Sequence, residues 1–225
     1  MSLDLARIQA LCFDVDGTLN ETDDQFIEQA VPFLKAIRYL LPGRDYQRAA
    51  RRFVMWAEAP GNLLLGVPDR FGFDDELAKM ASWLTQKRKA RIKHFRPIVG
   101  IQEMLASLHT RYPLSVVSAR DEATTREFLR QAAIDQYFTC IAGALTVEHT
   151  KPFPDPIFWV AQQMGVPPAN CLMIGDTTVD IRAGKAAGAQ TVGVLCGFGE
   201  EPELRRLGAN EILGTTSELA NLLLR

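Results

Sequence analysis

The sequence predicts an α/β fold, a parallel sheet covered by helices, with a further helical segment inserted near its start. Short β-branched and apolar runs alternate with segments whose apolar residues recur at helical spacing, a pattern typical of parallel sheets. About a hundred residues separate the first of these runs from the second, far more than one crossover helix needs. With 47% hydrophobic residues, the chain of 225 residues is long enough to bury such a core.

Six segments are predicted as strands because they are short, apolar and rich in β-branched residues: 8–13, 114–118, 138–142, 171–174, 191–195 and 211–213. Helical periodicity predicts helices between and after them, at 99–110, 122–132, 156–164, 179–187 and 217–224. Gly165 and Gly188 lie just past two of these helices, where a left-handed residue commonly ends a helix. Strands and helices therefore alternate along most of the chain.

The interval after the first strand is predicted to be helical throughout. Apolar residues recur there at helical spacing in three segments: 24–40, 45–58 and 74–93. Stretches that contain Pro and Gly connect these segments. The sequence therefore divides into a core, residues 1–20 and 94–225, and an all-helical insert, residues 21–93.

Charge and composition exclude several classes of protein. The formal net charge of −2 argues against the basic surface that nucleic-acid binding needs. The sequence has no run of about 18 uncharged apolar residues that would predict a membrane span. Its four cysteines lie far apart without a CxxC pair, so we expect free thiols and neither a disulfide nor a zinc site. We expect no secretory signal and a cytoplasmic protein, because no basic stretch precedes a long apolar run at the N-terminus.

Two carboxylates follow the first predicted strand. Asp14 and Asp16 are two residues apart, so their side chains point to the same side of an extended chain, and Gly17 lets the backbone turn directly after them. Ligands bind at the carboxyl ends of strands in an open parallel sheet. Two close carboxylates repel each other unless they share a cation or a proton. The alternative interpretation is a solvent-exposed acidic turn.

The fourth predicted strand brings two more carboxylates to the same edge of the sheet. Asp176 and Asp180 follow that strand, and with Asp14 and Asp16 they would form an oxygen-rich site suited to Mg²⁺ rather than to zinc. Asp180 could also simply stabilise the N-terminus of the helix that follows. These two roles of Asp180 are compatible.

Ser118 and Lys151 complete a predicted phosphate site. Ser118 ends the second strand and precedes a helix, so its hydroxyl and the nearby backbone N–H groups can hold phosphate oxygens. Lys151 opens a stiff, proline-rich turn after the third strand, Lys151-Pro152-Phe153-Pro154. A lone Ser or Lys carries little functional information. At strand ends beside a carboxylate cluster, phosphate binding is the better interpretation.

In four motifs the chain resembles the haloacid dehalogenase (HAD) superfamily, in particular its phosphoglycolate-phosphatase-like branch. The motifs occur in the family's order: Asp14-Val15-Asp16-Gly17-Thr18, then Ser118 after an apolar strand, then Lys151-Pro152-Phe153-Pro154, then Gly175-Asp176-Thr177-Thr178-Val179-Asp180. The resemblance implies a Rossmann-like, doubly wound core. It also implies that the insert is a type 1 helical cap.

The resemblance further implies a role for each motif residue. Asp14 would be the nucleophile that forms an aspartyl-phosphate, and Asp16 would be the general acid and base. The ligands of Mg²⁺ would be Asp14, Asp16 through its backbone carbonyl, and Asp176, with Asp180 behind them. Charge on the transferring phosphoryl group would be stabilised by Ser118 and Lys151. The expected function is hydrolysis of a small phosphorylated metabolite by a monomer or homodimer.

The chain departs from the family directly after the second motif. Many members have Asn there, whereas this chain has Ala119 followed by Arg120, so its substrate contacts can differ. The candidate substrate contacts are Thr18, the backbone of Ala119, Arg120, and Arg48 of the insert. Arg120 and the arginine-bearing helix face around Arg48 could equally be solvated surface charges.

Three other classes of protein share parts of this pattern. A dehalogenase would need neither Mg²⁺ nor a proton-donating Asp16. A phosphosugar mutase shares the core, the metal and the nucleophile, but mutases of this branch place a His where the chain has Phe26. Non-enzymatic phosphoreceiver domains also use an Asp at a strand end, but they are much shorter and have no large helical insert. The sequence therefore favours a phosphatase, with the mutase as its closest alternative.

Overall fold

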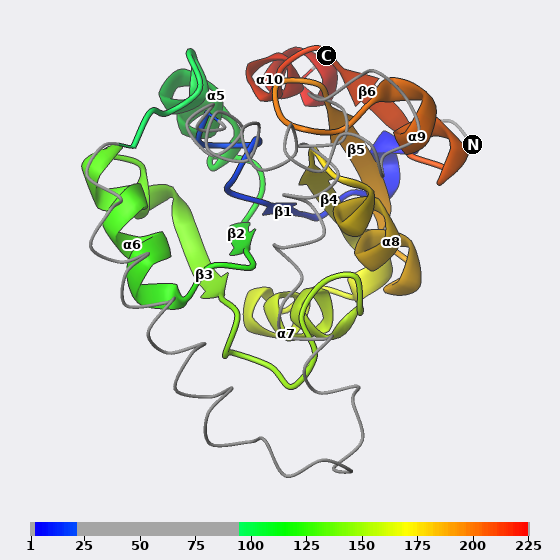
Figure 1. The fold of residues 1–225 in the computed structure, drawn as a ribbon, viewed down its shortest axis with the longest axis horizontal. Helices are drawn as coiled ribbons and strands as arrows, with labels where there is room; N and C mark the ends of the chain where they lie inside the picture. The colour runs from blue at the N-terminus through cyan, green and yellow to red at the C-terminus, as the bar shows by residue number, and fades with distance from the viewer. Residues whose placement is uncertain (1–2, 22–94, 225) are drawn as a thin grey trace, which may run out of the picture.

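A wholly parallel, six-stranded sheet forms the centre of the computed structural model, which describes residues 3–21 and 95–224 (Figure 1). Its strands are β1 Ala10–Phe13, β2 Leu114–Val117, β3 Phe138–Ala142, β4 Cys171–Gly175, β5 Gln190–Val194 and β6 Glu211–Leu213. All six predicted strands are confirmed. Their ends differ from the predicted ends by two residues or fewer, which is the ordinary uncertainty of strand boundaries.

The order of the strands is β3-β2-β1-β4-β5-β6. From β1 the chain moves outward through β2 and β3, then crosses to β4 on the other side of β1 and continues to β5 and β6. Phe13 is accordingly paired with Val116 of β2 on one side and with Ile174 of β4 on the other. This is the order of a Rossmann-like, doubly wound sheet, so the predicted fold class is confirmed. Such sheets bind ligands where the direction of winding changes, here at the carboxyl ends of β1 and β4.

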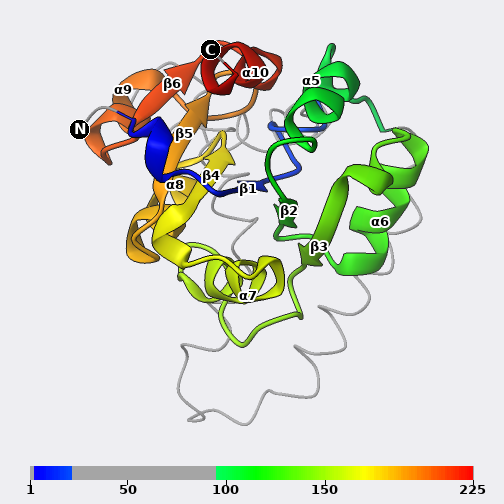
Figure 2. The same cartoon turned by 180° about the vertical axis from the view of Figure 1, so that it is seen from behind.

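Side chains of the central strands alternate between two apolar cores, one on each face of the sheet. Leu11 and Phe13 face a core closed by α5 Ile101–Leu108, α6 Glu122–Gln131 and α10 Leu219–Leu223. Ala10 and Cys12 face a core closed by α7 Asp155–Met164 and α8 Thr178–Ala186. In Figures 1 and 2, α5 and α10 lie toward the top of the view and α7 toward the bottom. Burial on both faces explains why every residue of β1 is apolar.

The helices after β5 differ from the prediction. A short helix, α9 Glu201–Arg206, was not predicted because six residues with one buried apolar side chain show no periodicity. Its acidic residues lie in its first turn and its arginines in its last, which suits the helix dipole. The predicted helix 217–224 is divided: a 3-10 turn, Thr216–Glu218, precedes α10. The buried Thr216 hydroxyl anchors this turn by donating to the carbonyl of Thr18 at 2.6 Å.

The chain leaves the core and returns to it at adjacent positions. The side-chain oxygen of Asn20 accepts a hydrogen bond from the Arg96 N–H at 2.9 Å, and the Glu21 N–H donates to the Arg96 carbonyl at 2.7 Å. Asn20 also forms an antiparallel bridge with Pro97. The predicted helices 24–40, 45–58 and 74–93 lie outside the described residues. Among the helices that the structure describes, none combines the length and apolar composition needed to cross a membrane.

Candidate active site

Asp14 is the first residue after β1 and is buried at the carboxyl edge of the sheet. Its backbone N–H donates to the carbonyl of Ile174 at 2.9 Å, so the pairing of β1 with β4 continues to this residue. The chain then turns sharply, because three backbone N–H groups donate to the carbonyl of Val15, those of Thr18, Leu19 and Asn20. The Asp14 side chain is therefore fixed at the centre of the sheet edge.

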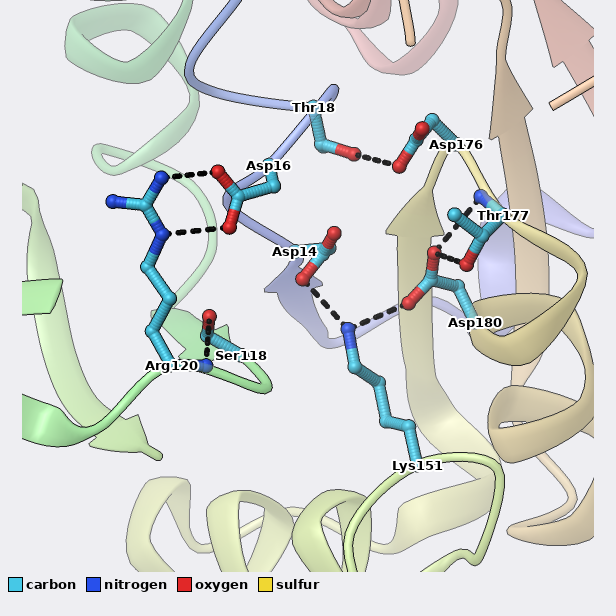
Figure 3. Close-up of polar contacts among 9 residues, drawn as sticks. All are labelled: Asp14, Asp16, Thr18, Ser118, Arg120, Lys151, Asp176, Thr177 and Asp180. Carbon is cyan, nitrogen blue, oxygen red and sulfur yellow. Dashed lines mark hydrogen bonds and ion pairs between the residues drawn. The ribbon is translucent and has the colours of Figure 1, made fainter. Parts of the chain in front are cut away.

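Lys151 connects two of the predicted carboxylates (Figure 3). Its Nζ atom donates to Oδ1 of Asp14 and to Oδ1 of Asp180, both at 2.6 Å. Burial alone would lower the pKa of Lys151, but the negative charges of Asp14 and Asp180 outweigh it and raise the pKa above its usual value. Lys151 is therefore a buried, permanently charged ammonium group.

The pKa of Asp14 is raised from 3.8 to about 7. Burial is the largest cause, because the charged carboxylate loses its hydration. Lys151 opposes this shift, whereas the neighbouring carboxylates of Asp180 and Asp16 add to it. The Asp14 carboxyl therefore holds its proton more tightly than the carboxyl of an exposed aspartate does.

Asp176 occupies a closely fitting site between the turn after β1 and the loop after β5. Its Oδ2 atom accepts a hydrogen bond from the Phe198 N–H at 2.7 Å, and its Oδ1 atom accepts one from the Thr18 hydroxyl at 3.5 Å. Two glycines allow this approach: a Cβ at Gly17 would lie 2.4 Å from Oδ2 of Asp176, and a Cβ at Gly197 only 2.1 Å from it. Any side chain at either position would displace the Asp176 carboxylate.

Three carboxylates lie close enough together to hold one metal ion, those of Asp14, Asp176 and Asp180. One oxygen from each lies within 4.8 Å of the others, and all three residues are buried. Lys151 supplies one positive charge against these three negative ones, so a divalent cation would balance the group. Carboxylate oxygens are ligands that Mg²⁺ prefers. The residues present therefore fit the expected metal.

Asp180 is bound to the start of α8 and to Lys151 at the same time. Its Oδ2 atom accepts hydrogen bonds from the backbone N–H of Thr177 at 3.0 Å and from the Thr177 hydroxyl at 2.6 Å, which stabilises the N-terminus of α8. Its Oδ1 atom accepts the hydrogen bond from Lys151 and faces the carboxylate group. The start of α8 thereby fixes the orientation of the Asp180 side chain.

Asp16 points away from the metal-binding group and toward Arg120 (Figure 3). Nε of Arg120 donates to Oδ2 of Asp16 at 2.6 Å, and Nη2 of Arg120 donates to Oδ1. The guanidinium group also lies over the ring of Phe95, 5.3 Å from its centroid. Arg120 is thus a partner of the predicted acid and base rather than a solvated surface charge. The Asp16 carboxylate lies outside the three-carboxylate group.

The other predicted contacts have separate surroundings. Ser118 is buried; its N–H donates to the Ala142 carbonyl at 2.9 Å and its hydroxyl oxygen accepts from the Arg120 N–H at 3.1 Å. Ala119 is exposed beside it. Thr18, predicted as a substrate contact, is fully buried against Asp176. Arg48 and the mutase-discriminating Phe26 lie outside the described residues.

The loop after β5 contributes a functional group that the motifs did not indicate, the backbone N–H of Phe198. A signal for it exists in the sequence, because Gly197 and Gly199 flank Phe198 directly after the fifth predicted strand. Glycines at the carboxyl end of a parallel strand indicate a close approach of the backbone to another group. Here that group is the carboxylate of Asp176.

Comparison with known proteins places this geometry in a family. Residues 11–194 match the family model described as haloacid dehalogenase-like hydrolase. A phosphoglycolate phosphatase from Neisseria meningitidis is 29% identical over 97% of this chain and 95% of its own length. A pyrophosphatase, PpaX, from Anoxybacillus flavithermus is 26% identical over 96% of this chain and 97% of its own.

A solved structure supports the same assignment. A hydrolase from Pseudomonas syringae superposes with a TM-score of 0.73 at 26% identity, covering 96% of this chain and 97% of its own. The similarity extends over nearly the whole length of both chains. The family resemblance carried by the four motifs is therefore confirmed.

Proposed function

We propose, because the chain belongs to the haloacid dehalogenase-like hydrolase family, that it hydrolyses a small phosphomonoester through an aspartyl-phosphate on Asp14, with Mg²⁺ as cofactor. The coarser function follows from the family and from the names of its relatives: the chain is an enzyme that acts on phosphate esters. The finer statement concerns the nucleophile, the metal and the substrate. It needs support from the geometry of the site.

The observation that supports it best is the position of Asp14. Its carboxylate lies at the centre of the sheet edge, bound to Lys151 at 2.6 Å and within 4.8 Å of oxygens from Asp176 and Asp180. An isolated acidic turn would not bury three carboxylates around one lysine. Buried, like-charged groups at a strand end are typical of functional sites, where charge is needed for chemistry rather than for stability.

The proposed reaction has two displacements at phosphorus. In the first, an oxygen of Asp14 attacks the phosphoryl group and the bond to the leaving oxygen breaks, while Asp16 gives that oxygen a proton. In the second, Asp16 takes a proton from a water molecule that attacks the aspartyl-phosphate. Inorganic phosphate leaves and the Asp14 carboxylate is restored. The proton that Asp16 donates in the first step is replaced in the second.

Two groups would stabilise the negative charge of the phosphoryl oxygens during both steps. The first is the ammonium of Lys151, which is already fixed beside Asp14. The second is the start of the loop after β2, with the hydroxyl of the buried Ser118 and the backbone N–H groups that follow it. When bound, Mg²⁺ would offset the charge that the carboxylates and the phosphoryl group bring together. The residues that would hold it are Asp14, Asp176, the backbone carbonyl of Asp16 and, behind these, Asp180.

The relatives suggest which phosphate compounds to test first. Their names specify phosphoglycolate and pyrophosphate, and in both compounds the group that leaves phosphorus is itself an anion. We therefore propose a small phosphorylated metabolite as the substrate. The cytoplasm is the proposed location, where the four free cysteines would stay reduced.

The test is phosphate release from a panel of small phosphomonoesters and pyrophosphate by the purified chain with Mg²⁺. Asp14→Asn should abolish release, because an amide is not a nucleophile in this reaction. Asp135→Asn is the matched control, since Asp135 lies before β3, at the opposite edge of the sheet. Full activity of Asp14→Asn would refute the mechanism. Conversion of a hexose 1-phosphate to its isomer without phosphate release would identify a mutase instead.

A further inference from the structure

The contact between Arg120 and Asp16 occupies both oxygens of the proposed acid and base (Figure 3). The Arg120 side chain is 17% exposed and that of Asp16 is 27% exposed, so solvent screens the pair only in part. A two-point contact between a guanidinium and a carboxylate is among the stronger ion pairs in proteins. It holds the Asp16 carboxylate turned away from Lys151 and Asp14.

The proposed reaction cannot proceed while this pair is intact. A carboxyl group that carries the proton for the leaving oxygen has an O–H on one oxygen, and that oxygen can no longer accept its guanidinium N–H in the two-point geometry. Asp16 must also turn one oxygen toward the phosphoryl group bound at Asp14. The contact between Arg120 and Asp16 therefore has to open in every turnover.

Arg120 is held at the site when Asp16 turns away. Its backbone N–H donates to the Ser118 hydroxyl at 3.1 Å, and its carbonyl accepts from the Ala144 N–H at 2.8 Å. Its guanidinium group is supported by the ring of Phe95. That ring in turn packs edge-on against Phe128 of α6, with 5.3 Å between the ring centroids. The positive charge consequently stays near the position that Asp16 vacates.

A guanidinium that loses its carboxylate in this position needs another anion. Removing one partner of a mostly buried ion pair is strongly unfavourable, because the remaining charge is left without compensation. Nη1 of Arg120 is buried, and no residue in the described part of the chain accepts a hydrogen bond from it. One donor nitrogen is thus available to an anion before the pair opens, and two further nitrogens, Nε and Nη2, become available afterwards.

We propose that Arg120 is a specificity-determining residue that exchanges Asp16 for an anionic group, a carboxylate or a phosphate, on the leaving half of the substrate. This inference rests on the proposed function, since it assigns a role within the same site. Binding of the substrate anion to Arg120 releases Asp16, which then protonates the leaving oxygen. A substrate with an uncharged leaving group has to open the pair without this compensation.

The kinetic test compares three substrates with Mg²⁺. Phosphoglycolate has a leaving group with a carboxylate, pyrophosphate has phosphate itself as its leaving group, and glycerol 1-phosphate has an uncharged leaving group. Arg120→Gln should lower kcat/KM for at least one anionic substrate about tenfold more than for glycerol 1-phosphate. Arg120→Lys should lower it less, because the charge remains. The substrate with the larger loss identifies carboxylate or phosphate as the recognised group.

The control is Arg126→Gln, because Arg126 lies in α6, the helix that follows Arg120 in the chain, and pairs with Glu122 on the exposed surface. It should leave all three values of kcat/KM unchanged. An equal loss for charged and uncharged leaving groups in Arg120→Gln would show that Arg120 only positions Asp16. That outcome, or no loss at all, would overturn the inference.

A binding measurement separates this inference from the proposed function. In the Asp14→Asn background with Mg²⁺, calorimetry gives the Kd of each of the three compounds without turnover. Adding Arg120→Gln should weaken binding of the recognised anionic compound about tenfold more than that of glycerol 1-phosphate. If the wild-type chain releases no phosphate from any compound, the proposed function fails. The inference fails if this difference in binding is absent, even when the wild-type chain releases phosphate. Arg120→Lys repeats the comparison should the glutamine variant unfold.

Discussion

The Nζ atom of Lys151 lies 2.6 Å from Oδ1 of Asp14, although 137 residues separate the two in the chain. The same ammonium group lies 2.6 Å from Oδ1 of Asp180. One buried cation therefore joins the end of β1 to the start of α8, where both carboxylates are also buried. The proposed chemistry and the stability of this part of the fold depend on the same three side chains.

Lys151→Met should destabilise the chain by about 3 kcal/mol in the presence of a chelator, because it leaves buried carboxylates without their cation. Urea unfolding measures this difference. Saturating Mg²⁺ should restore part of the loss, since a divalent ion supplies the missing charge. Lys185→Met is the control: Lys185 is exposed on α8 and donates to the Gly208 carbonyl at 3.3 Å. Equal stability of the two variants would contradict the role of Lys151.

Asp14 should make the stability of the chelated protein depend on pH. Its pKa is about 7 in the folded state against an ordinary value of 3.8, so the folded state binds the proton more tightly than the unfolded chain. The stability contributed by this group is fully present below about pH 4 and is lost as the pH rises through about 7. When thermal unfolding is measured from pH 5 to 8, the melting temperature of Asp14→Asn should therefore increase relative to that of the wild type as the pH approaches 8. A difference in melting temperature between the two proteins that stays constant with pH would show that the pKa of Asp14 is not raised by folding.

Asp176→Asn should have opposite effects with and without metal. The amide keeps an oxygen that can accept the hydrogen bond from Phe198, but it removes one of three clustered negative charges. Without Mg²⁺ the variant should be at least as stable as the wild type, because repulsion among the carboxylates falls. Its gain in stability on adding Mg²⁺ should be much smaller. Thermal unfolding with chelator and with Mg²⁺ measures both effects, and an undiminished gain would remove Asp176 from the metal site.

Gly197→Ala should weaken Mg²⁺ binding about tenfold, although it replaces none of the proposed metal ligands. A Cβ at this position would lie 2.1 Å from Oδ2 of Asp176, so the carboxylate has to move. Gly214→Ala is the matched control, because its Cβ would meet only the end of the flexible Glu218 side chain, at 3.2 Å. Calorimetric titration with Mg²⁺ compares the two variants. Identical affinities would mean that the position of Asp176 tolerates displacement.

The strands and the carboxylate cluster could be predicted because both follow from local rules. A strand buried on both faces must be apolar at every residue, and the carboxyl ends of parallel strands meet at one edge of the sheet. These two rules bring Asp14 and Asp176 together with no knowledge of side-chain conformation. They also place Ser118 and Lys151 at that edge.

The pairing of Arg120 with Asp16 could not be predicted in the same way. The two residues are 104 positions apart, and their contact depends on the conformations of two flexible side chains. It also depends on Phe95, which lies just before the return of the chain to the core and supports the guanidinium. The Phe198 N–H could not be predicted for a different reason: the glycines beside it indicate a close approach of the backbone, but not which group the backbone approaches.

The adjacent positions of Asn20 and Arg96 have a consequence for how such a chain can evolve. The entropic cost that an insertion imposes on its host depends mainly on bringing its two ends together, and here the ends are already joined by hydrogen bonds within the core. The number of residues between these two positions can therefore change during evolution at little entropic cost to the core. Such changes are confined to one continuous stretch of the gene.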